Sequence, residues 1–104
     1  APVSQGTEAE ARTREAPLKS QDVIVDLRGQ RVEDGLSQVD SFLDELLRRQ
    51  EIGGYVLHGH GTGAMKEAVR QHLRGHDVVL SSRPAERDEG GDAFTVFWLR
   101  DRAR

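Results

Sequence analysis

A glycine-rich stretch between an apolar run and an amphipathic segment most constrains how this chain can fold. The stretch is HGHGTG, residues 58–63; the apolar run YVL at 55–57 before it is typical of a strand, and residues 64–69 after it are typical of a helix. Glycine at every second position permits positive φ angles and leaves no Cβ to keep a ligand away. A helix begins with unpaired N–H groups and the positive end of its dipole. The stretch therefore predicts a strand-to-helix turn that can bind a phosphate or another anion.

A longer amphipathic segment precedes that strand. Apolar residues recur at steps of three and four from Val32 to Leu46, which predicts a helix over residues 32–50. Gly35 inside this helix costs about 1 kcal/mol relative to alanine, so we expect a compensating close contact there. We expect Gly53 and Gly54 to end the helix. The second helix should begin at Thr62 as its N-cap and stop at Gly75.

Four short apolar or β-branched runs predict strands. They cover residues 22–27, 54–58, 78–82 and 94–99, and a polar acidic loop at 84–92 separates the last two. The order of elements is βαβαββ. It predicts an α/β sandwich in which two helices pack on one mixed four-stranded sheet. The last strand is apolar enough to be central or covered.

The length of 104 residues allows one domain and a tail. Residues 1–20 lack hydrophobic periodicity and are interpreted as a flexible tail or linker, and residues 21–104 as the domain. The chain has no cysteine, which fits a reducing compartment, and its apolar runs are too short to span a bilayer. We therefore predict a cytoplasmic domain with no membrane partner.

The charge balance restricts how this domain can bind a polyanion. The net charge is −3, from 15 basic and 18 acidic residues, so binding must use a local basic patch and not the overall field. All four histidines lie between positions 58 and 76. The basic residues that could share a face with them are Arg28, Arg31, Lys66, Arg70 and Arg74.

Two polar motifs are predicted to meet at one edge of the sheet. The segment DLRG, residues 26–29, leaves the first strand, and HGHG, residues 58–61, leaves the second. In a βαβ unit the two strands are parallel, so both motifs lie at their carboxyl ends, where ligands bind in such folds. A carboxylate, a guanidinium and imidazoles above a helix N-terminus are groups that phosphodiester chemistry uses.

Several motifs taken together resemble those of an Smr (small MutS-related) domain, especially the one at the C-terminus of the second type of bacterial MutS-like ATPase. The matching segments are VDLRG at 25–29, RVEDGL at 31–36, HGHGTGAM at 58–65, and EGG at 89–91 before FTV at 94–96. Each motif is weak alone, but together they span residues 22–100 in the expected order and spacing. The resemblance implies binding of DNA or RNA and, in many members, nicking or endonuclease activity. For the long MutS-like proteins it also implies roles in recombination control, DNA repair and ribosome rescue.

The resemblance also implies roles for single residues. Asp26, Arg28 and His58 match positions that are candidates for catalysis. The residues predicted to bind nucleic acid are Arg28, Gly29, Arg31, Gly59, His60, Gly61, Thr62, Gly63 and Lys66. Two positions depart from the family pattern, because many members carry histidine in place of Arg28 and lysine in place of His60. The second change weakens the permanent positive charge of the loop at neutral pH.

Structural alternatives exist for the same side chains. Asp26 could simply cap the end of a strand, and Arg28 could pair with a surface acid. His58 could be a buried strand-end histidine bonded to the backbone. His72 and His76 have the i,i+4 spacing of a metal clamp, but no acidic pattern lies nearby in the sequence, so we predict no metal site there.

The leading hypothesis is a nucleic-acid-binding domain with nicking endonuclease activity, in which the glycine-rich loop and Arg28 hold the scissile phosphate. Asp26 would orient or deprotonate the nucleophile, and His58 or His60 would protonate the leaving oxygen. On RNA the nucleophile can be the 2′-OH without a metal. On DNA it must be water, and Mg²⁺ or Mn²⁺ bound through Asp26 becomes the favoured cofactor. The first alternative is a non-catalytic module that delivers a larger, dimeric protein to DNA, RNA or a ribosome, with the domain itself monomeric. A third is a protein adaptor that uses the acidic loop 86–92.

Overall fold

The sheet has four strands in the order β1-β2-β4-β3. This computed structural model describes residues 16–17 and 19–100. The strands are β1 (Ile24–Asp26), β2 (Gly53–Leu57), β3 (Val79–Pro84) and β4 (Phe94–Leu99). β1 and β2 are parallel, whereas β4 runs antiparallel to both β2 and β3. The mixed sheet that the sequence predicts is therefore confirmed, with the apolar strand β4 between β2 and β3.

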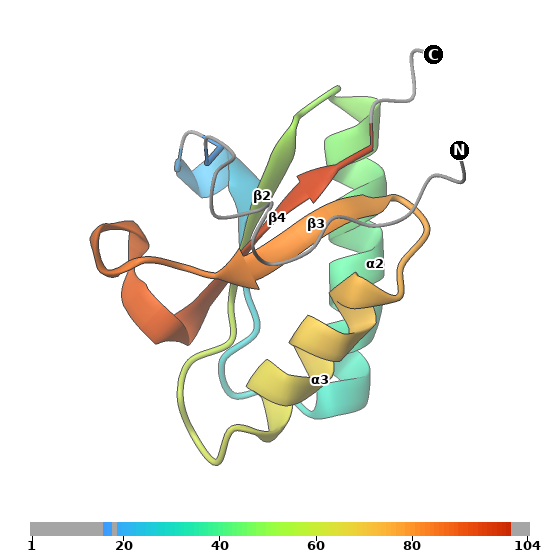
Figure 1. The fold of residues 1–104 in the computed structure, drawn as a ribbon. Helices are drawn as coiled ribbons and strands as arrows, with labels where there is room; N and C mark the ends of the chain where they lie inside the picture. Colours follow the sequence, from blue (N-terminus) through green and yellow to red (C-terminus); the bar gives the residue numbers. More distant parts are fainter. Residues whose placement is uncertain (1–15, 18, 101–104) are drawn as a thin grey trace.

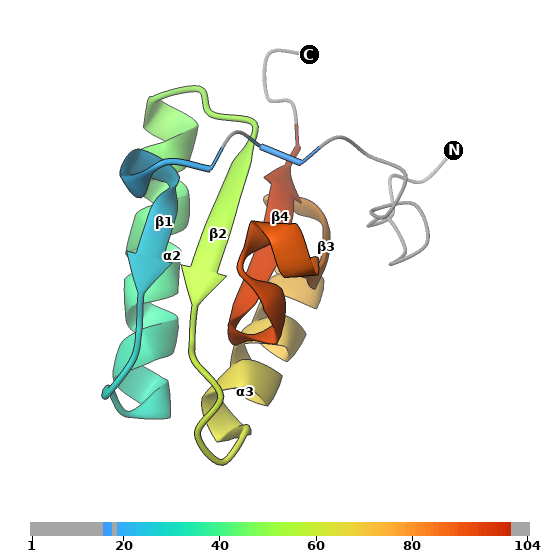
Figure 2. The same ribbon diagram turned by 90° about the vertical axis from the view of Figure 1, so that its left-hand side faces the viewer.

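Two helices connect the first three strands. They are α2 (Val32–Arg48) and α3 (Ala64–Arg74), and three short 3-10 turns complete the described elements: η1 (Gln21–Val23), η2 (Arg87–Glu89) and η3 (Gly91–Ala93). Both helices lie on the same face of the sheet, as Figures 1 and 2 show from two directions. The predicted α/β arrangement is correct. The acidic loop differs in detail, because it contains the two turns η2 and η3.

The core lies between this helical layer and the sheet. The predicted stripe of α2 is buried at Val39, Leu43 and Leu46, each with no exposed surface. From α3, Val69 and Leu73 enter the same core, and Val96 and Phe97 of β4 meet them. Trp98 is 3% exposed and belongs to the core, so it offers no ring surface to a nucleic-acid base.

The glycines of α2 and β2 are close-packing positions. A Cβ on Gly35 would lie 2.7 Å from Cε of Met65, so the expected contact exists and is made by α3. Gly53 and Gly54 do not end the helix, contrary to prediction. They lie within β2, where a Cβ on Gly53 would lie 2.1 Å from the carbonyl oxygen of Phe97. Gln50, with φ at 61°, turns the chain after α2 instead.

The segment that precedes η1 contacts the domain. The Tyr55 hydroxyl donates to the Pro17 carbonyl at 2.7 Å, and Lys19 Nζ lies 3.8 Å from the centre of the Phe94 ring. Of the predicted tail, residues 1–15 and 18 lie outside the described residues. Within the described part of the chain, neither helix has the length and apolar character that a membrane span needs.

Candidate nucleic-acid interface

The connections that leave β1 and β2 start at the same end of the sheet. The parallel pairing continues past the end of β1, because Leu27 N–H donates to the Leu57 carbonyl at 2.9 Å. Residues 27–31 and 58–63 then run side by side, as both ribbon views show (Figures 1 and 2). The structure thus brings the two sequence motifs together beside the N-termini of α2 and α3.

Asp26 and Arg28 form a closed pair at this edge. The Arg28 side chain donates through Nε to Asp26 Oδ1 at 3.1 Å and through its terminal nitrogen to Oδ2 at 2.9 Å. The Arg28 backbone N–H also donates to Oδ1, at 3.0 Å. These hydrogen bonds lower the pKa of the Asp26 carboxyl below its ordinary value of 3.8. Asp26 is therefore a charged group that orients Arg28 and a weak proton acceptor near neutral pH.

Arg28 also links the first motif to the second. A Cβ placed on Gly59 would lie 3.3 Å from Cγ and 3.6 Å from Cδ of Arg28, so the aliphatic part of Arg28 packs over the Gly59 backbone. Gly59 has φ at 77°, which favours glycine. The side chain of Arg28 remains 62% exposed, so its guanidinium faces solvent above the glycine-rich loop.

The glycine-rich loop is open on its outer side. Gly61 and Gly63 have φ of 44° and 90°, and a Cβ on either would meet nothing within 4 Å. Gly63 is the N-cap of α3, so the prediction that Thr62 would be the N-cap is wrong. The Thr62 hydroxyl instead accepts the Ala64 N–H at 3.3 Å. The first N–H groups of α3 therefore lie behind a loop that a phosphate can approach closely.

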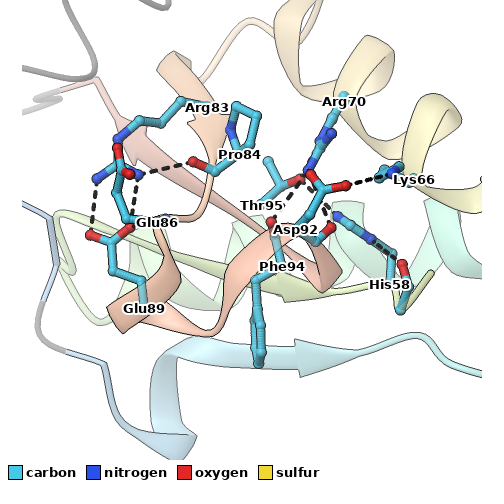
Figure 3. Close-up of polar contacts among 11 residues, drawn as sticks. His58, Lys66, Arg70, Arg83, Pro84, Glu86, Glu89, Asp92, Phe94 and Thr95 are labelled. Atoms are coloured by element: carbon cyan, nitrogen blue, oxygen red, sulfur yellow. Dashed lines mark hydrogen bonds and ion pairs between the residues drawn. The ribbon is translucent and has the colours of Figure 1, made fainter.

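His58 lies behind this loop and is 6% exposed. Its Nδ1 donates to the Gly59 carbonyl at 2.9 Å, which leaves Nε2 as the acceptor for the Thr95 hydroxyl at 2.8 Å. Arg70 Nε donates to the same Thr95 oxygen at 2.8 Å (Figure 3). Burial, followed by the nearby charges of Arg70 and Lys66, lowers the His58 pKa below 6.5. These contacts favour the structural alternative for His58, a neutral imidazole that fixes the loop.

Asp92 forms ion pairs with two basic side chains of α3. Its carboxylate accepts from Lys66 Nζ at 2.7 Å and from Arg70 at 2.9 Å (Figure 3). The hydrogen bonds from Lys66 and then Arg70 lower the Asp92 pKa to about 2. The carboxylate is half exposed, at 51%, so an incoming phosphate can compete with it for both cations.

The acidic loop is also paired with the domain. Arg83 donates to both carboxylate oxygens of Glu89, at 2.7 and 2.9 Å (Figure 3). These bonds lower the Glu89 pKa below its ordinary value, and Arg83 is itself 5% exposed. Glu89 and Asp92 are thus paired with arginine or lysine, whereas Glu86 and Asp88 of the same loop are exposed to solvent.

The remaining predicted residues lie around the same edge of the sheet. Gly29, Arg31 and His60 are exposed there, and Arg31 is the N-cap of α2. Sequence reasoning missed Thr95 and Asp92, because they come from β4 and η3, about thirty residues after the loop. The motifs EGG and FTV were the signals for them, because EGG leads into the turn that presents Asp92 and FTV contains Thr95.

A divalent ion at Asp26 does not fit the donor set at this edge. Asp26 provides one carboxylate, and both of its oxygens already accept hydrogen bonds from Arg28. Mg²⁺ and Mn²⁺ need several oxygen ligands. Among residues 16–17 and 19–100, the group of three potential ligands that does come together lies elsewhere, at Asp40, His72 and His76.

The fold is that of an α/β domain, and its candidate anion-binding edge combines an arginine that follows β1 with a glycine-rich loop that follows β2. The chain belongs to the Smr domain family, whose family model matches residues 25–100.

Known proteins support this assignment in sequence and in structure. Endonuclease MutS2 of Anaeromyxobacter sp. (strain Fw109-5) is 50% identical over 76 residues, which are 73% of this chain and 9% of that protein. Endonuclease MutS2 of Staphylococcus carnosus is 38% identical over 90 residues, 86% of this chain and 11% of that protein. This chain therefore spans about a tenth of the length of these relatives.

Two solved structures share the fold. The Smr domain of Thermus thermophilus MutS2 aligns with a TM-score of 0.72 and 42% identity, covering 74% of this chain and 96% of that one. YdaL, a stand-alone small MutS-related protein from Escherichia coli, aligns with a TM-score of 0.74 and 23% identity, covering 86% of this chain and 70% of that one. At that identity, YdaL supports the fold alone.

Proposed function

We propose that this domain binds DNA or RNA through the edge formed by Arg28 and the glycine-rich loop, and that it cleaves the bound strand as a nicking endonuclease. The observation that carries the proposal is the contact of Arg28 with the Gly59 backbone. It joins a guanidinium to an open loop at the N-terminus of α3. Relatives named endonuclease MutS2 support the activity, and a nucleic-acid substrate agrees with the cytoplasmic location predicted from the sequence.

The phosphate group is held by complementary donors in this proposal. Gly61 and Gly63 let the sugar-phosphate backbone approach the first N–H groups of α3. Arg28, kept in position by Asp26, contributes a planar fork of donors. Arg31 and His60 extend the contact along the bound nucleic-acid strand. Lys66 contributes when a phosphate displaces it from Asp92.

Cleavage then depends on orientation and charge stabilisation. On RNA, the 2′-hydroxyl gives its proton to a solvent water, and the 2′-oxygen forms a bond to phosphorus while the bond from phosphorus to the 5′-oxygen breaks. Asp26 orients Arg28 against the negative charge that develops on the phosphoryl oxygens, and the leaving 5′-oxygen takes its proton from His60 or solvent. His58 fixes the loop through Thr95 and the Gly59 carbonyl. On DNA, water replaces the 2′-oxygen as nucleophile.

The test is cleavage by the purified domain, with supercoiled plasmid and single-stranded RNA offered side by side. Each reaction is run with Mg²⁺, with Mn²⁺ and with EDTA, for the wild type and for Asp26→Asn. We expect the mutant to bind nearly as well as the wild type, because the loop and the charge of Arg28 remain, and to lose cleavage, because asparagine cannot accept both hydrogen bonds that orient Arg28. Cleavage that persists in the mutant would exclude Asp26 from catalysis.

The hydrogen bonds that the site residues already make within the protein favour a second function. Both Asp26 oxygens and both His58 ring nitrogens have partners within the protein, as expected of a module that binds without cleaving. Such a module would target a larger MutS-like protein, dimeric as a whole, to DNA, RNA or a ribosome in recombination control, DNA repair or ribosome rescue. Retained gel-shift binding with no cleavage of either substrate would establish this function in place of the nuclease.

A further inference from the structure

A group of metal-ligating side chains lies away from the glycine-rich loop, where α2 and α3 face each other. His72 Nε2 donates to Asp40 Oδ1 at 2.7 Å, and His76 Nε2 lies 3.3 Å from the same oxygen. The two imidazole rings are 5.6 Å apart between centroids. One potential ligand atom from each residue lies within 4.8 Å of the other two. Asp40 on α2, His72 on α3 and His76 just after α3 therefore bring two imidazoles and one carboxylate to one point.

We propose that Asp40, His72 and His76 form a binding site for a divalent transition-metal ion, of which Zn²⁺ is the representative. Two nitrogens and one oxygen suit zinc and its neighbours, whereas Mg²⁺ and Ca²⁺ prefer oxygen ligands. Around a tetrahedral zinc, neighbouring ligand atoms are roughly 3.3 Å apart, given zinc–nitrogen bonds of about 2.0 Å. Small side-chain rotations suffice to reach that geometry from the distances present.

The surroundings allow an ion to reach this site. The side chains of His72 and His76 are 27% and 25% exposed, and that of Asp40 is 52% exposed. Three protein ligands leave one tetrahedral position for water. Val78 N–H donates to His76 Nδ1 at 3.3 Å, so metal binding at Nε2, which needs the His76 proton on Nδ1, would break this long hydrogen bond.

The site is separate from the nucleic-acid edge. His72 lies eight residues after Ala64, the first residue of α3, and is therefore about 12 Å further along the helix. Asp40 is on α2, so a bound ion joins the two helices and stabilises the folded chain. The role that follows from this placement is structural.

The test is a titration of the full chain with Zn²⁺ alone, followed by calorimetry, with Co²⁺ absorption as a second readout of ligand number. The variants are His76→Gln and Asp40→Asn. The matched control is Asp44→Asn, which makes the same charge change on the exposed face of α2 one turn further on. His76→Gln keeps the test decisive if Asp40→Asn fails to fold.

We expect one ion per chain and a rise in Tm with Zn²⁺. Affinity should fall by about tenfold or more in His76→Gln and Asp40→Asn, because each loses one of three ligands, and should be unchanged in Asp44→Asn. Equal affinity in His76→Gln and the wild type would place the ion elsewhere, at His58 or His60 for example, and would overturn the proposal. So would the absence of stoichiometric binding.

Discussion

At the scale of single residues, Arg28 connects the two motifs of the proposed interface. Its guanidinium is fixed by two side-chain bonds to Asp26, while its aliphatic part covers Gly59. A lysine here would provide charge but not the planar fork that pairs with a carboxylate and then with a phosphate. Arg28 is thus a side chain that is charged at every physiological pH.

Replacing Arg28 with alanine should weaken binding of DNA and RNA to a similar degree for all sequences. Because the lost contact is to phosphate, the slope of log affinity against log salt should fall by about one. Fluorescence anisotropy over a salt series measures both. Arg48→Ala, an exposed change at the far end of α2, is the control and should leave the slope unaltered. An unchanged slope in Arg28→Ala would remove Arg28 from the interface.

His58 should make the stability of the domain depend on pH. Burial lowers its folded pKa below 6.5, so the unfolded chain binds more protons once the pH falls below about 6.5. The stabilisation is complete above this pH and decreases as the pH falls toward the folded pKa. The His58→Gln variant has no imidazole at this position, so its stability should not decrease in this way as the pH falls. The Tm advantage of the wild type should therefore shrink between about pH 8 and pH 5, and a constant difference would contradict the account.

At the scale of elements, glycines serve two separate purposes. Gly53 allows β2 to pack against β4, since a Cβ there would lie 2.1 Å from a carbonyl oxygen. Gly61 opens the loop, and a Cβ there meets nothing within 4 Å. The sequence pattern does not separate these cases, because whether a neighbour is near depends on the tertiary contacts of strands that are distant along the chain.

A substitution at Gly61 should therefore mainly affect nucleic-acid binding, whereas a substitution at Gly53 should mainly affect stability. Gly61→Val should reduce nucleic-acid binding more than stability, because it blocks the approach of a ligand and strains only one positive φ. Gly53→Ala should lower the free energy of unfolding by about 2 kcal/mol or more, because backbone atoms must move apart. Thermal melts and gel shifts of both variants measure this. Intact binding with a collapsed Tm in Gly61→Val would refute the assignment.

The helix α2 provides a direct check of the core. Leu43 is fully buried between α2 and the sheet. Leu43→Ala should cost about 2–5 kcal/mol, from lost burial and the cavity that remains. Denaturant unfolding measures the loss, with Ser37→Ala on the exposed face as the control. An unchanged unfolding midpoint for Leu43→Ala would mean that this face of α2 is not the packed one.

At the scale of the whole molecule, the sequence predicts the helices and strands that show as periodic or continuous apolar patterns over neighbouring residues. The stripe from Val32 to Leu46 predicts α2, and the apolar run of β4 predicts a central strand, because each pattern reports burial directly. The edge where both motifs meet follows from parallel strand pairing. The contacts of Asp92 and Thr95 with α3 could not be predicted, because they depend on how η3 and β4 return beneath the glycine-rich loop. The group at Asp40 was missed for the same reason, since its histidines lie more than thirty residues away.

The central claim is that residues 28–31 and 59–66 form one interface for nucleic acid. The most direct measurement is an NMR titration of the ¹⁵N-labelled domain with a short single-stranded RNA and with a DNA duplex at low salt. We predict that the largest amide shifts occur in these two segments together and that they are smaller at equal ligand concentration in Arg28→Ala. Largest shifts on the second half of α2 or on β3, or shifts in only one of the two segments, would contradict it.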